Sequence, residues 1–364
     1  LTPYSEKENC CGCHACYNVC RVDAITFKDD EYGFAYPFID ETKCIGCNMC
    51  REICDFQNGS IAKTKPIEAY AAVNKDEDVL KISSSGGVFG AFAKYFLDQG
   101  GVVFGCAYNE NMEPVHISAE NDKDLKKIHG SKYVQSNTYN IYAKIKEYLA
   151  QHRKVLFTGT PCQVAALKSY LGVDYNNLLT VDFVCHGVPS ASMFKKYISY
   201  LEKKHEMKIT DYCFRSKARG WPAYVQEIKC TKQHNVSAMN IKLGAEEEFY
   251  LPYYLKGNLS RPSCFECRYA SPERVSDITI GDFWGYQQAS LKIKISQGLS
   301  ICLLNNSMYS KFQGLFAGLN LERVEVDLAV RGNRQLNAPE CKGDRWDQVM
   351  ENFKKGNFDD IAKE

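Results

Sequence analysis

CCGCHACYNVC at residues 10–20 and CIGCNMCREIC at residues 44–54 are the most distinctive stretches of the sequence. With Cys11 left out, each carries four cysteines in the pattern C-x2-C-x2-C-x3-C. Every cysteine of the first run has a counterpart 34 residues further on, so residues 10–54 contain an internal duplication. The chain has 18 cysteines in all, and nine of them lie within the first 54 residues.

This spacing is typical of ferredoxin-type iron–sulfur sites. Three cysteines two residues apart let one tight loop wrap a 4Fe-4S cubane, while the fourth cysteine reaches the other cluster. Cys10, Cys13, Cys16 and Cys54 are then expected to hold cluster one, and Cys44, Cys47, Cys50 and Cys20 cluster two. The alternative is a pair of zinc knuckles, but zinc sites usually space their ligands as two separated pairs. One departure is that Arg21 and Asp55 stand where a proline usually follows the fourth cysteine.

Length and composition place these sites in a globular chain. With 364 residues, two or three domains are expected. The formal net charge is +1, which gives no support to nucleic-acid binding. The mean hydropathy is −0.36 with no long apolar run, so no membrane span is expected. Leu1–Asn9 is polar and does not resemble a signal peptide. We therefore expect reduced, metal-binding cysteines and a cytoplasmic location rather than a disulfide scaffold.

The rest of the chain predicts strands alternating with helices, which indicates an α/β core. The clearest unit has a strand at 154–157, a loop at 158–161 and a helix at 162–170. It recurs as a strand at 178–184 and a helix at 190–204. Other expected strands are 68–73, 102–107, 114–119, 211–215, 224–231, 277–280, 299–304 and 321–327. Other expected helices are 88–97, 121–128, 141–149, one between 304 and 321, and 345–353.

The segment Ser83–Gly87 precedes the helix expected at 88–97. Serine at an N-cap followed by glycines leaves backbone N–H groups free, which suits a phosphate group. A plain capped helix is the alternative. The glycines at 100, 101 and 105 do not form G-x-G-x-x-G, so a standard nicotinamide site is not indicated.

Four cysteines of the second half lie in loops marked by glycine or proline: Cys162, Cys185, Cys264 and Cys267. Such a set suits either a third 4Fe-4S cluster or a zinc ion held by four thiolates, and spacing favours neither. A nucleophilic Cys162–His186 pair is a further alternative. The cysteines in expected strands (Cys106, Cys213, Cys230 and Cys302) are predicted to be buried free thiols. Cys341 lies in a polar loop and could be either a metal ligand or a free thiol.

Several strings in order make the chain resemble the β-subunit family of coenzyme F420 hydrogenases and dehydrogenases. They are SGG at 85–87, GSKYVQS at 130–136, TGTPCQ at 158–163, CHGVPS at 185–190, C-x2-C at 264–267 and GDFWG at 281–285. The resemblance covers roughly residues 10–330. It implies FAD in the α/β domain and a 4Fe-4S cluster nearby, held by Cys162, Cys185, Cys264 and Cys267.

The resemblance also suggests where the flavin would lie. Ser85, Gly86 and Gly87 are expected at its pyrophosphate. Its ring system is expected near Gly130, Ser131, Tyr133, Ser136, Thr158, Gly159 and Thr160. Candidate proton-transfer groups are His186, His129 and Lys132. Lys132, Arg215 and Arg219 could bind an anionic substrate, and Trp221 and Trp284 could pack on a ring, although surface charge and core packing explain such residues equally well.

The expected architecture combines an α+β part with an α/β part. Residues 1–60 would form a small ferredoxin-like domain with two 4Fe-4S clusters, residues 61–340 a larger flavin-binding domain, and 341–364 a helical tail. The predicted function is an iron–sulfur flavoprotein oxidoreductase that uses three clusters and FAD. It would pass electrons between ferredoxin, or another low-potential carrier, and a small organic substrate, and could form a homo-oligomer. The alternatives are an F420-dependent enzyme and an electron-transfer subunit with no substrate site.

Overall fold

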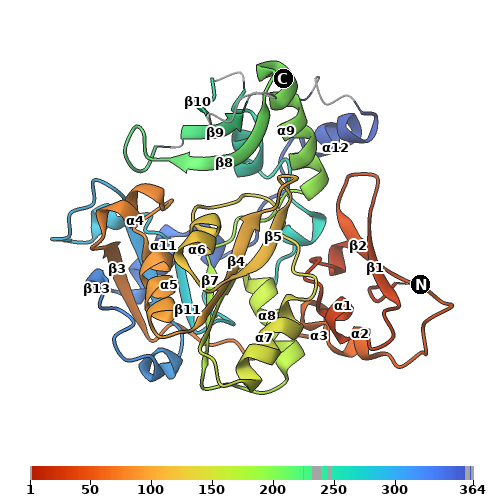
Figure 1. The fold of residues 1–364 in the computed structure, drawn as a ribbon, viewed down its shortest axis with the longest axis horizontal. Coiled ribbons are helices and arrows are strands. Elements are labelled where there is room, and N and C mark those ends of the chain that lie inside the picture. Colours follow the sequence, from red (N-terminus) through yellow and green to blue (C-terminus); the bar gives the residue numbers. More distant parts are fainter. Residues whose placement is uncertain (1, 224, 232–238, 245–246, 357–360, 362–364) are drawn as a thin grey trace.

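A mixed eight-stranded sheet forms the centre of the computed structural model, which describes residues 2–223, 225–231, 239–244, 247–356 and 361 (Figure 1). The strand order is β13-β3-β12-β11-β7-β6-β4-β5. The strands are β3 Glu68–Asn74, β4 Val102–Tyr108, β5 Pro114–Ala119, β6 Val155–Gly159, β7 Leu178–Phe183, β11 Ile278–Asp282, β12 Ser300–Leu304 and β13 Leu319–Val324. Strands β4, β6, β7 and β11 run parallel, while β5 on one side and β12, β3 and β13 on the other pair antiparallel. The predicted α/β core is confirmed, with antiparallel edges added.

Apolar strands and amphipathic helices explain this arrangement. Val155, Leu156 and Phe157 of β6 are all fully buried, as expected for a parallel strand covered on both faces. Four helices follow the strands and pack on the sheet or on one another: α5 Val88–Asp98, α6 Asp122–Ile128, α7 Ile141–Ala150 and α8 Pro161–Leu171. Helix α8 contacts β6 and β7 on one side, and its other side meets the N-terminal region.

The N-terminal cysteine region forms a lobe beside α7 and α8 (Figure 1). It consists of η1 Lys7–Asn9, α1 Ala15–Val19, the antiparallel pair β1 Ile25–Asp29 and β2 Ala35–Ile39, α2 Met49–Glu52 and α3 Asp55–Asn58. Ala15 and Ile53 are buried in the same apolar cluster as Tyr142 of α7 and Val164 of α8. The lobe is therefore docked on the larger sheet by shared hydrophobic core.

A third layer lies across the other end of the molecule. A small antiparallel sheet of β8 Lys208–Ser216, β9 Val225–Thr231 and β10 Met239–Lys242 packs with α9 Ala191–His205, α10 Tyr250–Leu255 and α12 Trp346–Lys354. The buried Trp346 of α12 donates its indole N–H to the carbonyl of Ser260 over 2.9 Å. Phe34, between β1 and β2, is buried in the same cluster, so this layer also contacts the N-terminal lobe.

Some sequence-based expectations need correction. Between β12 and β13 there is only the 3-10 turn η4 Ser307–Lys311, because Asn306 caps a single short turn there. The strand expected to reach residue 327 ends at Val324, and α11 Val326–Gly332 begins two residues later. Helix α4 Glu77–Ile82, with Asp76 as its N-cap, and α10 were not predicted. Three further 3-10 turns lie between these elements: η2 Pro262–Cys264, η3 Tyr286–Gln288 and η5 Arg334–Leu336.

The cysteines expected in strands differ in their exposure. Cys213 is exposed, contrary to the prediction, because it occupies an outward position of the alternating strand β8. Cys230 and Cys302 are fully buried as predicted. Tyr224, expected at the start of a strand, lies outside the described residues. None of the helices in the described part of the chain has the length and apolar character that crossing a bilayer requires.

Candidate functional site

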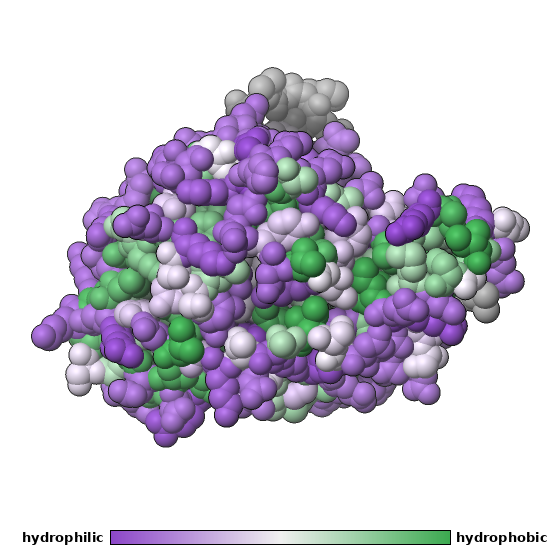
Figure 2. Space-filling model, turned by 90° about the horizontal axis from the view of Figure 1, so that it is seen from below, coloured by the Kyte–Doolittle hydropathy of each residue, from purple (hydrophilic) through white to green (hydrophobic). Residues whose placement is uncertain are grey.

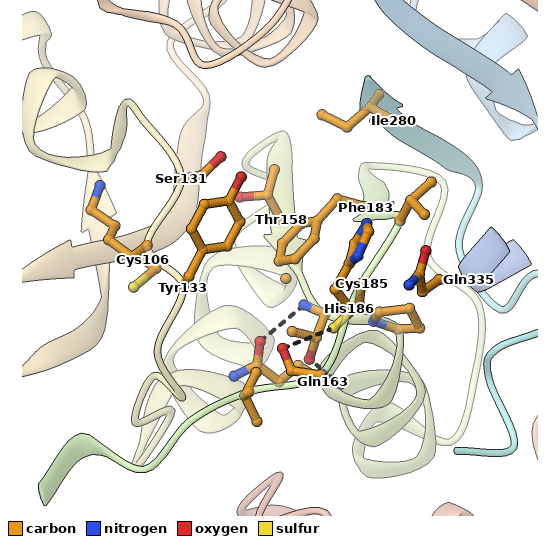
Figure 3. A pocket seen from close by; sticks show the side chains of 18 of the residues that line it. Cys106, Ser131, Tyr133, Thr158, Gln163, Phe183, Cys185, His186, Ile280 and Gln335 are labelled. Atoms are coloured by element: carbon orange, nitrogen blue, oxygen red, sulfur yellow. Dashed lines mark hydrogen bonds between the residues drawn. The ribbon is translucent and has the colours of Figure 1, made fainter. Parts of the chain in front are cut away.

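A cavity of ≈ 290 Å³ opens at the carboxyl ends of β6, β7 and β11 (Figure 3). In α/β sheets this edge is where ligands bind, because the loops that leave parallel strands converge there. Most lining residues fall within segments 83–89, 128–136, 158–163, 183–188, 263–270 and 280–284, with a few more from 333–340 and from the N-terminal region. The loops that carried the sequence motifs therefore meet around one space.

The turn from β6 into α8 places the first cavity cysteine. Thr160 is the N-cap and forms a capping box with Gln163, while Pro161 occupies the first helical position. The Thr160 hydroxyl lies 3.0 Å from Sγ of Cys162. The neighbouring Cys11 thiol is the main cause that lowers the pKa of Cys162, and Thr160 adds to it, against the opposing effect of burial. Cys11, with a smaller contribution from the turn, thus favours a thiolate at the cavity wall.

The four loop cysteines of the second half converge on this cavity. Cys162, Cys185, Cys264 and Cys267 all line it. Burial raises the pKa of the Cys185 thiol well above its usual value, and the thiols of Cys264, Cys162 and Cys267 raise it further. Within the described residues, no three Cys, His, Asp or Glu side chains are arranged to hold a single metal ion. Four thiols that converge on one cavity match the ligand number of a 4Fe-4S cluster and of a structural zinc ion alike.

The N-terminal cysteines gather in two groups. Burial raises the pKa of Cys16 well above its usual value, and Cys13, Cys10, Cys54 and Cys50 contribute in that order. The structure thus brings together the four cysteines expected for cluster one.

The second group lies at the surface of the lobe. The pKa of Cys50 is raised by burial and then by Cys47 and Cys44, of which the last two are exposed. The Cys20 sulfur accepts a hydrogen bond from the backbone N–H of Ala24 over 3.3 Å. The described contacts do not couple Cys20 to the other three.

Cys11, which the sequence pattern excluded, occupies the boundary between the lobe and the cavity. Its buried thiol lines the cavity with Gly12. Hydrogen bonds to Cys13 and Cys162 are the main causes that raise its pKa. Cys11 therefore lies between Cys13 of the first N-terminal group and Cys162 of the cavity group, and contacts both.

The segment Ser83–Gly87 differs from its expected form. The N-cap of α5 is Gly87, with φ of 77°, and no serine side chain caps the helix. The N–H of Gly86 donates to Ser300 Oγ over 2.9 Å, so it is not free for a phosphate. A Cβ at Gly86 would lie 2.2 Å from the carbonyl oxygen of Ala72, so close packing explains this glycine. Ser85 and Gly87 line the cavity, whereas Gly86 is not among its lining residues.

The remaining positions expected near a flavin all line the cavity: Gly130, Ser131, Tyr133, Ser136, Thr158, Gly159 and Thr160. Tyr133 stacks on Tyr254 with ring centroids 5.0 Å apart, so one of its faces is already covered. The Tyr133 hydroxyl accepts a bond from Arg215, which is also ion-paired with Asp282. These contacts hold an aromatic and a charged group rigidly at the wall.

The three candidate proton-transfer residues all lie at the cavity. Burial lowers the pKa of His186, and it lowers that of His129 to about 4, so both rings are neutral at neutral pH. The Lys132 ammonium instead donates to backbone carbonyls at the end of α6, among them those of Ile128 and His129. Lys132 therefore closes a helix terminus, a role that accounts for its position without catalysis.

The other candidates divide between cavity and surface. Arg215 and Trp284 line the cavity, whereas Arg219 is exposed and outside it. Trp221 stacks on Trp284 at 5.8 Å and donates its indole N–H to Asp282 over 3.2 Å. The tryptophans thus pack on each other.

Sequence reasoning missed a buried polar chain behind the β6 turn. His116 Nε2 lies 3.0 Å from the Thr158 carbonyl, so this nitrogen carries the hydrogen and Nδ1 accepts from Ser136 Oγ, also at 3.0 Å. Gln163 Nε2 in turn lies 3.0 Å from Ser136 Oγ. His116 sits on a strand far from every motif, and alternating polarity in 114–119 was its only signal.

Comparison with known families identifies the class of protein. Residues 9–58 match the 4Fe-4S dicluster domain. With this domain and a thiol-lined cavity on an α/β sheet, the chain is an iron–sulfur protein of the oxidoreductase class.

The family follows from two further matches. Residues 69–142 match the N-terminal part, and residues 152–314 the C-terminal part, of the coenzyme F420 hydrogenase/dehydrogenase β subunit. The chain belongs to this family, and the predicted resemblance is confirmed.

Comparison of structures and of curated proteins adds little. A chain of the F420-reducing NiFe hydrogenase complex from Methanosarcina barkeri is similar at 18% identity and a TM-score of 0.45, over 82% of this chain and 91% of that one. No curated protein matches the sequence.

Proposed function

We propose that the chain is an iron–sulfur flavoprotein oxidoreductase that passes electrons between a low-potential carrier such as ferredoxin and a small organic substrate. The observation that carries this proposal is the continuous series of cysteines across the molecule. It begins at the exposed Cys44 and Cys47, continues through the group around Cys16, and reaches Cys162 by way of Cys11. In this proposal residues 1–60 are the entry domain, 61–340 the substrate domain and 341–364 a helical extension.

Three 4Fe-4S clusters and FAD would supply the chemistry, since clusters carry single electrons and a flavin couples them to hydride transfer. The cluster ligands would be the eight N-terminal cysteines and the four cavity cysteines. The cavity volume of ≈ 290 Å³ is just below the range of about 300–1,000 Å³ usual for ligand sites. Its enclosed part suits a ring system better than a whole dinucleotide.

The chain's own residues would exclude water and orient the ligand. The aromatic wall at Tyr133 and the Arg215–Asp282 pair supply one rigid side. The neutral His186 and His129 can each hold or accept a proton at the cavity.

Metal and flavin content of the anaerobically purified chain tests the proposal. We expect about twelve iron atoms, about twelve sulfides and one FAD per chain. Cys185→Ser should lower iron to about eight while the N-terminal clusters remain. Cys213→Ser, an exposed cysteine outside all groups, is the matched control and should leave iron unchanged. About eight irons without flavin in the wild-type chain would refute the reductase proposal.

A second candidate follows from the family: the carrier could be the deazaflavin coenzyme F420 instead of ferredoxin. Reduced F420 would then bleach the bound flavin rapidly in the absence of any protein carrier. Reduced ferredoxin would do so only under the first proposal. A chain that is reduced by either carrier but turns over only with a partner protein would be an electron-transfer subunit.

A further inference from the structure

Arg261 links the cavity loop to the first N-terminal cysteine. It is fully buried, with 0% of its surface exposed, just before the turn Pro262–Cys264. Its Nε donates to the carbonyl of Cys10 over 2.8 Å, and one terminal nitrogen donates to Ala35 and Gln135 at 3.1 and 3.0 Å. The other terminal nitrogen lies 3.8 Å from Sγ of Cys10. The guanidinium therefore touches a cysteine predicted to ligate cluster one.

The charge on Arg261 has no carboxylate partner in the described part of the chain. The two other buried arginines differ, because Arg215 is paired with Asp282, and Arg274 with Asp182 at 3.0 Å. An unpaired charge inside a protein is strongly unfavourable, so such residues are normally compensated. The folded chain must therefore supply negative charge beside Arg261 in some other form.

The groups around the guanidinium indicate what that charge is. One terminal nitrogen of Arg261 lies 3.8 Å from the Cys10 sulfur, and a set of thiolates around an iron–sulfur cubane carries net negative charge. The Tyr36 ring lies 4.1 Å from the guanidinium carbon and covers it with an apolar but electron-rich face.

The surrounding packing keeps the arginine in this one position. Gly12 has φ of +65°, and a Cβ there would lie 2.4 Å from Gln135 Nε2 and 3.1 Å from Arg261. Gln135 Nε2 donates to the carbonyls of Cys11 and Gly12 at 2.9 and 3.2 Å. The loop that carries the cysteines therefore closes directly over the Arg261–Gln135 pair, without room for a side chain between them.

We propose that Arg261 is the counter-charge of cluster one and raises its reduction potential relative to a cluster without a buried cation. The inference rests on the proposed function, in which Cys10, Cys13, Cys16 and Cys54 hold that cluster. Reduction adds one negative charge, and a fixed cation in a low-dielectric site stabilises the reduced form more than the oxidised form.

An anaerobic redox titration followed by electron paramagnetic resonance tests this directly. In Arg261→Gln, we expect one of the clusters to shift to lower potential. At a fixed potential its ratio of reduced to oxidised form should fall about tenfold, which corresponds to about 59 mV for a one-electron couple. Arg261→Lys keeps the charge but loses the forked hydrogen bonds, so it should retain most of the wild-type potential.

Arg268→Gln is the matched control for domain docking. Arg268 also reaches from the cavity loop into the N-terminal lobe, but it donates to the carbonyls of Asp55 and Phe56 at 3.0 and 3.1 Å. Because Arg268 is partly exposed to water, its loss should weaken docking with a smaller shift in potential than the loss of Arg261. Arg261→Gln that contains full iron and shows unchanged potentials would overturn the inference.

A second variant covers the case in which Arg261→Gln does not fold. Gln135→Glu leaves the arginine in place and puts a carboxylate on it, so the potential should shift in the same direction. An unchanged potential in Gln135→Glu overturns the inference as well. Failure of the proposed function is distinguishable, because the wild-type chain would then hold about eight irons and no flavin, while the potentials of its two N-terminal clusters would still test the role of Arg261.

Discussion

Tyr269 donates its phenolic hydrogen to Oδ2 of the buried Asp55 over 2.6 Å, and so joins the cavity loop to the N-terminal lobe. Asp55 also accepts from the backbone N–H of Ile61 at 2.6 Å and from Ser60 Oγ at 3.1 Å. It directly follows Cys54, where a ferredoxin run usually has proline. A proline could accept none of these bonds. The departure from the usual pattern is thus the anchor that docks the lobe.

We expect Tyr269→Phe to destabilise the folded chain by about 1–3 kcal/mol, because a buried carboxylate loses a donor. The measurement is anaerobic thermal unfolding of the loaded protein. Tyr148→Phe is the matched control, since Tyr148 makes the same kind of bond to Glu120 at 2.7 Å on the exposed surface. Water can replace that bond, so a loss below about 1 kcal/mol is expected there. Equal losses in the two variants would contradict a special role for the buried pair.

A second prediction concerns pH. Burial lowers the pKa of His116 to about 4 from the usual 6.5. As pH falls, the unfolded chain therefore takes up this proton before the folded chain does. The contribution of His116 to stability is complete above pH about 6.5 and is lost progressively toward pH about 4. The full loss is on the order of 3 kcal/mol.

Unfolding free energies measured across this pH range check the prediction. His116→Gln should flatten the pH dependence, because the amide keeps a donor for the Thr158 carbonyl but does not titrate. His152→Asn is the control: His152 is exposed and has a left-handed backbone that asparagine tolerates. An unchanged slope in His116→Gln would show that other groups control the acid transition.

A third prediction separates Cys11 from the cluster ligands. Cys11→Ala should retain the full iron content, whereas Cys13→Ala should lose about four irons per chain. The physical reason is that Cys11 breaks the two-residue spacing that lets one loop surround a cubane. Iron and sulfide analysis of both variants decides the matter. Loss of a cluster in Cys11→Ala would mean that the first run uses a different set of four.

Local sequence signals predicted the elements that surround the cavity well. The helix expected at 162–170 is present as α8, which begins one residue earlier at Pro161, after the capping box of Thr160 and Gln163. The parallel strands β6 and β7 are apolar runs between turn residues and were equally visible. Convergence of Cys162 and Cys185 then follows from the rule that such loops meet at one sheet edge.

Features that depend on distant contacts could not be predicted in this way. Cys11 looked superfluous because its role depends on Cys162, which is far away in the sequence. Arg261 carries no local sequence signal, and only the docked lobe shows that it is fully buried. The N-cap at Gly87 was misassigned because the serines before it bond to other elements, among them Ser85 to the carbonyl of Leu299 over 2.8 Å.

A final prediction concerns the place where a protein carrier delivers electrons. Ile45 lies between two exposed cysteines of the second group and is itself 69% exposed, with Phe38 at 41% on the same lobe. Figure 2 shows apolar side chains gathered on this projecting N-terminal lobe. Exposed apolar side chains beside a redox centre suit a transient docking site, because a carrier can approach without displacing tightly bound water.

Ile45→Glu should therefore slow reduction of the chain by reduced ferredoxin several-fold, while reduction by a small viologen should be unaffected. A charged side chain there costs desolvation on docking but leaves the cluster accessible to a small molecule. Val173→Glu is the control, because Val173 is 63% exposed just beyond the end of α8. Rates from anaerobic stopped-flow measurements separate the cases. Equal slowing by both variants, or slowing with viologen too, would mean that Ile45 is not part of a carrier site and that electrons enter elsewhere.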